Sequence, residues 1–444
     1  MAVPVTGPDD AAHPLPSGRR AYFLALLTLV YALAFLDRQI INILAEPIKH
    51  DLHLADWQMG AMTGFAFALL YTVLGLPAAR LSERGSRSGI IGVALILWSG
   101  FTAASGYAQN FAQLLLARIG VGIGEAGCVP PAHSLITDIT PREKRAGALA
   151  IFSMGLPIGT LLGMALGGVV AELHGWRVAF LLVGLPGVFL AILLLLTARD
   201  PRAVEMRDRM RPKADILPLA QTIRLLWATK SFRWLALGAA LIAFTGYGHQ
   251  TFFGSFYLRN HGAGLDGLAA VIGFDGRIAT LGIVLGLILG VSATVGTGWG
   301  GKLGDRFAKA GPRGYLVVPI WATAASVPFL IATFLVPSIG WSLLFLAVPS
   351  FLKAMWYGPV FACVQSVVPP RSRATAVAVF LFVVNAIGIG LGPVVAGAVS
   401  DILSQSFGEA EGLRLSLVFL SLSVLAAVAC FLAARRTIEQ DFRS

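Results

Sequence analysis

Long apolar runs separated by short polar loops recur along almost the whole chain after residue 20. A helix rises about 1.5 Å per residue, so ~20 apolar residues cross the ~30 Å hydrocarbon core of a membrane. The runs of that length fall into two groups of six, separated by a polar stretch at residues 199–231. We predict a membrane-spanning helix over each run: residues 21–45, 57–80, 88–106, 111–137, 146–171 and 177–198 in the first group, and residues 232–258, 272–299, 314–336, 341–367, 374–401 and 413–434 in the second.

The second group of runs repeats the first. Val129–Phe152 aligns without gaps with Tyr357–Phe380, and the alignment matches Arg145 with Arg373 at an offset of 373 − 145 = 228. We therefore predict that a six-helix unit has been duplicated. Parallel six-helix repeats build transporters whose substrate site lies near the membrane midplane between the halves, so we expect a central cavity there.

The composition supports a membrane protein. Hydrophobic residues make up 56% of the chain and charged residues only 13%, whereas soluble domains carry about 25% charged residues. We predict an all-α polytopic membrane protein. It divides into a tail at residues 1–20, an N-terminal six-helix bundle at 21–198, a linker with an amphipathic helix at 199–231, a C-terminal six-helix bundle at 232–434 and a tail at 435–444.

The basic residues predict the orientation in the membrane. The chain has 34 Lys and Arg against 23 Asp and Glu, a net charge of +11, which by itself would also suit nucleic-acid binding. These basic residues lie in alternate loops, however, and the loops between them are nearly bare. The positive-inside rule then puts both termini in the cytoplasm and the protein in the cell (inner) membrane, with no nucleic-acid partner. We expect the amphipathic segment 217–227 to lie on the membrane surface, where it either binds anionic lipids or only anchors the linker.

Four charged residues lie deep inside predicted spans. Asp37 and Arg38 are adjacent in the first run, and Arg118 and Glu125 share a face of the fourth run. An ionisable group at this depth costs roughly 2.5 to 3.5 kcal/mol, so it should face protein or a watery cavity. Asp37 and Glu125 can compete for the two arginines, and an acid that loses its cationic partner in a low-dielectric site becomes a proton carrier. The alternative is a set of fixed ion pairs that only brace the helices.

The repeat adds a fifth buried charge. Because 125 + 228 = 353, Lys353 occupies the place in the second half that Glu125 occupies in the first. No acidic residue lies deep in the seventh, tenth or eleventh run, so we expect Lys353 to meet an anionic ligand; the alternative is a side chain that reaches the outer rim of the membrane. The substrate-binding candidates are Arg38, Glu125, Lys353, His249, Tyr247, Trp356 and Tyr357. A single histidine in a span, however, more often bonds to a neighbouring helix.

Several motifs resemble those of one family. ARLSERGSR at residues 79–87 and GKLGDRF at 301–307 resemble the loop motif of the major facilitator superfamily, and ARIGVGIGEAG at 117–127 resembles its fourth-helix motif. The N-terminal half also resembles the spinster branch of that family through LDRQ at 36–39, PREKRAGA at 141–148 and GWRVAFLLVGLPG at 175–187. The resemblance implies the major facilitator fold, with twelve transmembrane helices in two six-helix repeats around a central cavity.

The resemblance also implies roles for individual residues. In the spinster branch, proton coupling is attributed to the acidic residues of helices one and four, here Asp37 and Glu125, beside Arg38 and Arg118. Residues of the loop motifs and of the repeated segment are expected to latch the cytoplasmic ends of the helices: Glu83, Arg84, Asp305, Arg306, Arg145 and Arg373. The first loop motif departs mildly from the usual pattern, since it has Ala79 and Glu83 where Gly and Asp are usual.

We therefore expect a proton-coupled secondary active transporter that moves an amphipathic, anionic, lysolipid-like molecule by alternating access. Its rival is proton-coupled uptake of a small organic or sugar acid by the same fold. A membrane-embedded lipid enzyme is the alternative outside transport, but His133 and His249 have no nearby nucleophile or metal-ligand spacing. Cys128, Cys363 and Cys430 form no CxxC pair, so we expect no metal and no cofactor. The expected partners are the substrate, protons and membrane lipids, and the expected state is a monomer.

Overall fold

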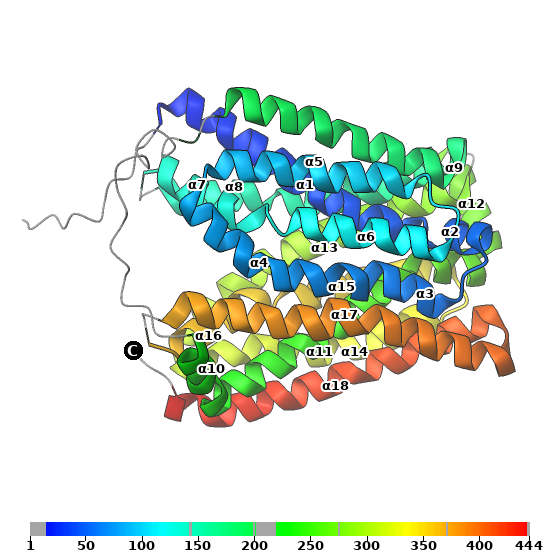
Figure 1. Ribbon diagram of the computed structural model, residues 1–444. Coiled ribbons are helices and arrows are strands. Elements are labelled where there is room, and N and C mark those ends of the chain that lie inside the picture. The colour runs from blue at the N-terminus through cyan, green and yellow to red at the C-terminus, as the bar shows by residue number, and fades with distance from the viewer. Residues whose placement is uncertain are drawn as a thin grey trace, which may run out of the picture.

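The computed structural model describes residues 15–141, 144–198, 200, 219–273, 276–369 and 372–441, which form a bundle of helices (Figure 1). The first half contains α1 (Ser17–Ile43), α2 (Ala45–Leu52), α3 (Asp56–Gly60), the π-helix η1 (Ala61–Phe65), α4 (Ala66–Arg84), α5 (Arg87–Ser105), α6 (Phe111–Glu125), α7 (Val129–Ile139), α8 (Arg145–Ser153) and α9 (Gly155–Thr197). Helix α10 (Leu219–Ala228) lies in the linker. The second half contains α11 (Lys230–Asn260), α12 (Gly262–Ile272), α13 (Arg277–Ala308), the 3-10 helix η4 (Pro312–Leu316), α14 (Val317–Leu335), α15 (Ile339–Ala354), α16 (Tyr357–Ser366), α17 (Arg373–Phe407) and α18 (Glu409–Asp441). No strand occurs in these residues, so the predicted all-α class is confirmed.

The helices are consistent with the twelve predicted passes. Within the described residues, 10 helical segments are long and apolar enough to cross a membrane. One of them, Gly147–Thr197, holds two passes, because its helix breaks at Gly175 with φ 82°. Only glycine adopts this backbone conformation easily. Helix α11 also has the length of a pass, with 31 residues.

Both halves run between two distinct ends of the bundle. Helix α1 begins and helix α18 ends at one end, which we call the terminal end; α7, α8, α10 and α16 lie there too (Figure 1). Helices α2, α3 and α12 lie at the opposite end, which we call the far end (Figure 1). Helix α18 continues to Asp441, beyond the predicted end of its span at residue 434.

The repeat of the two halves is visible in the helix breaks of two equivalent passes. In the first half, α6 ends at Glu125 and α7 begins at Val129; in the second, α15 ends at Ala354 and α16 begins at Tyr357. Since 129 + 228 = 357, the two breaks fall at equivalent positions. Helix α7 starts with proline in its first turn, where the missing backbone N–H is tolerated. Each broken pass therefore ends its first helix beside a candidate charge, Glu125 or Lys353.

The two halves touch closely near the far end and separate toward the terminal end. A Cβ atom built on Gly282 of α13 would lie 2.2 Å from the carbonyl oxygen of Met164 on α9, so the two backbones are in contact. At Gly290, farther along α13, the corresponding distance to the carbonyl oxygen of Pro157 is 3.3 Å. Helix α3 meets α17 in the same close way at Gly60. Glycine permits such contacts because it carries no side chain.

Candidate functional site

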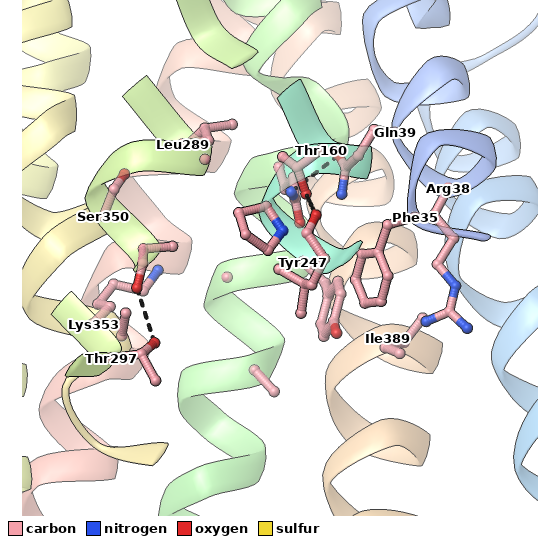
Figure 2. Close-up of a pocket in the computed structure, with 18 of the residues that line it drawn as sticks. Phe35, Arg38, Gln39, Thr160, Tyr247, Leu289, Thr297, Ser350, Lys353 and Ile389 are labelled. Atoms are coloured by element: carbon pink, nitrogen blue, oxygen red, sulfur yellow. Dashed lines mark hydrogen bonds between the residues drawn. The ribbon is translucent and has the colours of Figure 1, made fainter. Parts of the chain in front are cut away.

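A cavity of about 610 Å³ lies between the two halves. Residues of α1, η1, α4, α6, α8 and α9 line it from the first half, and residues of α11, α13, α14, α15, α16 and α17 line it from the second. Its aromatic lining residues are Tyr31, Phe35, Phe67, Tyr247, Phe253, Trp356 and Tyr357. Figure 2 shows Arg38 and Lys353 on opposite walls, with Phe35 and Tyr247 between them. The cavity thus combines a largely apolar wall with separate cationic groups.

Arg38 is held by a carboxylate and by aromatic rings. Its Nε donates to Glu125 Oε2 at 2.7 Å, and its Nη2 lies 2.6 Å from the same oxygen. The guanidinium carbon lies 4.5 Å from the ring centre of Phe67 and 4.7 Å from that of Tyr71, which are cation–π distances. Arg38 lines the cavity, whereas Glu125 is 1% exposed and lies behind it. Glu125 therefore reaches the cavity through Arg38.

Asp37 faces away from the cavity, because neighbouring residues of a helix point about 100° apart. Asp37 Oδ1 lies 3.7 Å from Arg118 Nη1, and Thr102 Oγ1 donates to Asp37 Oδ2. Several atoms of this buried group have no hydrogen-bond partner among the described residues: Asp37 Oδ1, Arg118 Nε, Arg118 Nη1 and Glu125 Oε1. Buried polar atoms are usually satisfied, and exceptions call for a functional explanation. The structure thus pairs Arg118 with Asp37 and Arg38 with Glu125, pairings that the sequence left open.

Lys353 stands in the cavity wall without a counter-charge. No described residue forms an ion pair or hydrogen bond with its Nζ. A Cβ atom built on Gly246 of α11 would lie 3.8 Å from Nζ, and apart from the adjoining backbone of α11 no other described atom lies within 4 Å of it. Lys353 is in the last turn of α15, where the partial negative charge of the helix end favours a cation. Its side chain therefore points across the cavity toward α11.

The remaining predicted substrate residues fall into two groups. Tyr247, Trp356 and Tyr357 line the cavity, and the rings of Trp356 and Tyr357 stack with centres 4.3 Å apart. His249 is fully buried outside the lining, and its Nε2 lies 2.9 Å from the carbonyl oxygen of Leu417. His249 thus bonds to a neighbouring helix, which was the alternative expected for a single histidine in a span. Its geometry does not support a direct role in substrate binding.

Amides from both halves meet where the cavity closes toward the far end. Gln39 Oε1 accepts from Gln250 Nε2 and from Asn42 Nδ2, each at 3.0 Å. Thr63 and Thr251 hydroxyls lie 3.3 Å apart beside them. These five residues line the cavity, and we call them the amide floor. The floor joins α1 to α11, the equivalent first helices of the two halves.

Those predicted latch residues whose side chains the structure describes do not bridge the halves at the terminal end. Arg145 Nε donates to the carbonyl oxygen of Thr140, and Arg373 Nε donates to that of Gln365, each within its own half. Asp305 and Arg306 are exposed and form no ion pair with another described residue. The side chains of Glu83 and Arg84 lie outside the described residues. The latch role therefore stays a prediction.

The far end carries an ionic cluster that the sequence analysis did not identify. Arg259 of α11 donates to both oxygens of Glu46 and to both of Asp56, at 2.8 to 2.9 Å. Lys49 Nζ lies 3.0 Å from Asp56 Oδ1. Burial opposes the ionisation of Glu46, but hydrogen bonds from Arg259 outweigh burial and lower its pKa. The cluster ties the second half to the first, and we call it the far-end clamp.

Two carboxylates also cap helices across the boundary between the halves. Asp401 of α17 accepts from the backbone N–H of Asp56 at 3.0 Å and of Trp57 at 2.8 Å, at the start of α3. Glu172 of α9 accepts from the backbone N–H of Ile278 at 2.7 Å, at the start of α13. Since 172 + 228 = 400, the two acids lie at nearly equivalent positions, as do the helices they cap. The sequence could have indicated these caps through two acids near the repeat offset, but it does not show which helix each acid caps.

Residues 27–393 match the family described as Major Facilitator Superfamily. An MFS-type efflux pump of Mycolicibacterium smegmatis is 33% identical over 451 aligned positions that cover 100% of both chains. Protein spinster homolog 1 of Homo sapiens is 27% identical over 97% of this chain and 83% of that protein.

A solved structure shares the fold as well as the sequence. It is a bacterial homolog of the human lysosomal transporter Spinster, in an inward-facing and unoccupied conformation. The match has a TM-score of 0.85 and 33% identity, and it covers 97% of this chain and 100% of that one. The similarity therefore extends over both halves of the bundle.

Proposed function

The chain is a transporter of the spinster type within the Major Facilitator Superfamily, and on that premise we propose that it moves an amphipathic anion by alternating access, driven by protons. It is a multi-pass membrane protein and not an enzyme. The basic loops support an orientation with both termini in the cytoplasm and a place in the inner membrane. It works as a monomer, because each copy contains both halves and the cavity between them.

The observation that carries proton coupling is the pair of buried acid–base contacts on α1 and α6. Glu125 is 1% exposed, and among the described residues its hydrogen bond to Arg38 links it to the cavity. Asp37 is also buried, and one of its oxygens has no hydrogen-bond partner among the described residues. A buried carboxylate with incomplete pairing is costly, and a proton removes that cost. Both acids are therefore suited to take up and release protons during transport.

The proton acts by changing the partners of an arginine. When Glu125 is protonated, it no longer holds Arg38 by charge, and Arg38 is free to meet an anionic group in the cavity. Arg118 lies 3.7 Å from Asp37 without a hydrogen bond, and a proton on Asp37 would weaken this looser pair as well. If the opposite-facing state stabilises the neutral acids better by ~2.7 kcal/mol, the ratio of the two states changes about a hundredfold. A small energy difference is therefore enough to drive the switch.

Alternating access needs gates at both ends. The far-end clamp and the two helix caps hold the halves together at the far end. The loop residues Glu83, Arg84, Asp305 and Arg306 would hold the terminal end when the far end opens, together with Arg145 and Arg373. With the terminal end in the cytoplasm, the described conformation is inward-facing, like that of the bacterial homolog.

The amphipathic nature of the substrate rests on the lining of the cavity. Aromatic side chains from both halves provide apolar surface, and the walls carry Arg38 and Lys353 as cations. Such a cavity suits a molecule with an anionic head and an apolar body, such as a lysolipid. The amide floor supports a second candidate, a small organic or sugar acid, because amides and hydroxyls bind sugar hydroxyl groups.

Proton flux into proteoliposomes upon addition of substrate tests the coupling. We expect that Asp37→Asn and Glu125→Gln each abolish substrate-dependent proton movement, while both proteins still fold, insert and bind ligand without a gradient. The double substitution should be no worse than either single one, because residues of one coupled site are not additive. Asp266→Asn is the matched control, since Asp266 is exposed and pairs with Arg277 at 2.6 Å outside the cavity. Persistent proton flux in both single variants would overturn the coupling proposal.

A further inference from the structure

We propose that Lys353 makes the cavity select amphiphiles with a single net negative charge over zwitterionic and neutral ones with the same apolar tail. This inference rests on the proposed transport function and names the charge class of its substrate. The site consists of Lys353 on α15, the open space over Gly246 on α11, and the neighbouring rings of Trp356 and Tyr357. The ligand would be a carboxylate, sulfate or phosphodiester monoanion carrying an acyl or aromatic body.

The charges around the cavity leave one cation unmatched. Three described cations line the cavity: Arg38, Arg118 and Lys353. Arg38 pairs with Glu125, and Arg118 faces Asp37, so each arginine has one acid. Lys353 has none among the described residues. A single compensating charge must therefore come from the ligand, because an ammonium group in a low-dielectric wall without a counter-charge is costly.

The surroundings of Lys353 supply no counter-ion and leave room for an anion. It sits in the last turn of α15, whose helix end carries partial negative charge but cannot form an ion pair. The hydroxyls of Ser350 and Thr297 next to it donate to backbone carbonyls of their own helices, at 2.7 and 2.9 Å. Both hydroxyls are uncharged, so neither one is a counter-ion for Lys353. Gly246 presents no side chain toward Nζ, so the space in front of the ammonium is open.

The lining disfavours a second charge on the ligand. Among the described residues, no carboxylate lines the cavity, so a quaternary ammonium group would find no ionic partner there. Stacked aromatic rings can attract a cation, and the rings of Trp356 and Tyr357 are near Lys353. Lys353 opposes that attraction, because its own positive charge lies in the same wall. We therefore expect a zwitterion to bind more weakly than a monoanion.

The test adds an internal counter-charge in front of Lys353. A Cβ at position 246 would lie 3.8 Å from Nζ, so the carboxylate of Gly246→Asp reaches the ammonium and replaces the ligand's charge. Gly246→Asn is the matched control, because it has the same shape without the charge and a similar helix propensity. The probes are lysophosphatidylglycerol, lysophosphatidylcholine and monoacylglycerol with one acyl chain, together with glucuronate, a monoanion without a tail. Binding is measured by thermal stabilisation of the purified protein.

Wild type and Gly246→Asn should bind lysophosphatidylglycerol about 10- to 100-fold more tightly than monoacylglycerol, the range expected for a charged hydrogen bond. Gly246→Asp and Lys353→Gln should lose this preference while they keep the affinity for monoacylglycerol, and Lys353→Arg should retain it in part. An unchanged preference in folded Gly246→Asp and Lys353→Gln would overturn the inference and leave the transport proposal intact. Equal binding of the zwitterion and the monoanion by wild type would also overturn it.

Glucuronate separates this inference from the proposed substrate. If glucuronate binds in a Lys353-dependent manner and none of the lipids binds, the charge selection by Lys353 is supported and the amphipathic substrate class is wrong. If wild-type protein binds none of the four probes, both the substrate class and the role of Lys353 are refuted. Proton flux in the Asp37→Asn and Glu125→Gln variants remains an independent measure of coupling in either case.

Discussion

Replacing Arg259 with glutamine should open the far end of the bundle. Arg259 is the centre of the far-end clamp, where it donates four hydrogen bonds to Glu46 and Asp56. Its side chain is 7% exposed and those of its partners are 8% and 1% exposed, so these pairs are buried. Removing one partner of a buried ion pair costs roughly 3 to 5 kcal/mol. That cost applies only to the closed state, because the clamp joins the two halves.

The magnitude decides whether the change can be observed. At the low end, ~3 kcal/mol lowers the ratio of closed to open far ends by about 150-fold, since each 1.4 kcal/mol is a factor of ten. Lys49 stays beside Asp56 at 3.0 Å and offsets part of the lost charge. A shift of one to two orders of magnitude is therefore expected, and it would convert a protein that is almost wholly closed into a measurable mixture.

Distances between spin labels on the two halves measure the shift. Suitable positions are Tyr107 and Val271, which are 71% and 83% exposed and lie near the far end of different halves. The described native cysteines are buried, so labels attach to cysteines introduced at these two positions. Arg259→Gln should add a population with a longer distance that wild type lacks.

A matched arginine provides the control. Arg277 also forms an ion pair, with Asp266 at 2.6 Å, but both residues belong to the second half and are about half exposed. Arg277→Gln should therefore leave the distance distribution unchanged. If Arg259→Gln protein is folded and gives the wild-type distribution, the far-end clamp does not hold the halves together and the reasoning is refuted.

Two further predictions concern the same end. Asp401→Asn should weaken the cap on α3, because a neutral amide is a poorer acceptor for the N–H groups of Asp56 and Trp57. The same spin labels should report a smaller shift in distance than for Arg259→Gln. Unchanged distances in both Asp401→Asn and Glu172→Gln would show that the two caps do not hold the far end closed. The pKa of Glu46 is lower in the closed state than the ordinary value of a glutamate, about 4.3. Its charge therefore stabilises the closed far end fully above that ordinary value, and this stabilisation is lost as the pH falls through the lowered pKa. Acidification to below that range should therefore open the far end in wild type but have less effect in Glu46→Gln, and equal pH responses in the two proteins would contradict the assignment.

The sequence predicted the fold because a membrane span is a local property. Length and apolarity indicate each pass without knowledge of its neighbours. The offset of 228 equated Glu125 with Lys353, and the structure adds that a pass breaks beside each of them. The pairing of charges was not predictable in the same way. Whether Arg118 meets Asp37 or Glu125 depends on the rotation of α6 and its distance from α1, which no pattern along the chain records.

Contacts between the halves were the hardest to foresee. Arg259 and its partner Glu46 are 259 − 46 = 213 positions apart, and both looked like ordinary loop charges at the ends of spans. His249 illustrates the related problem of direction, because it lies one residue from Gln250 of the amide floor yet points away from the cavity to Leu417. The depth of a residue in a span can be predicted from the sequence. The direction in which its side chain points cannot be predicted when the helix is apolar on all sides.

The two halves are alike where they close the molecule and different where they line the cavity. Asp401 caps α3 and Glu172 caps α13 from nearly equivalent positions, so the far end is closed by one device used twice. At the helix breaks, by contrast, the equivalent positions hold an acid, Glu125, and a base, Lys353. A gate gains from symmetry, because both halves must part together when it opens. The proposed site for a proton and an anion would need groups of opposite charge, and this proposal accounts for the divergence of the repeat there.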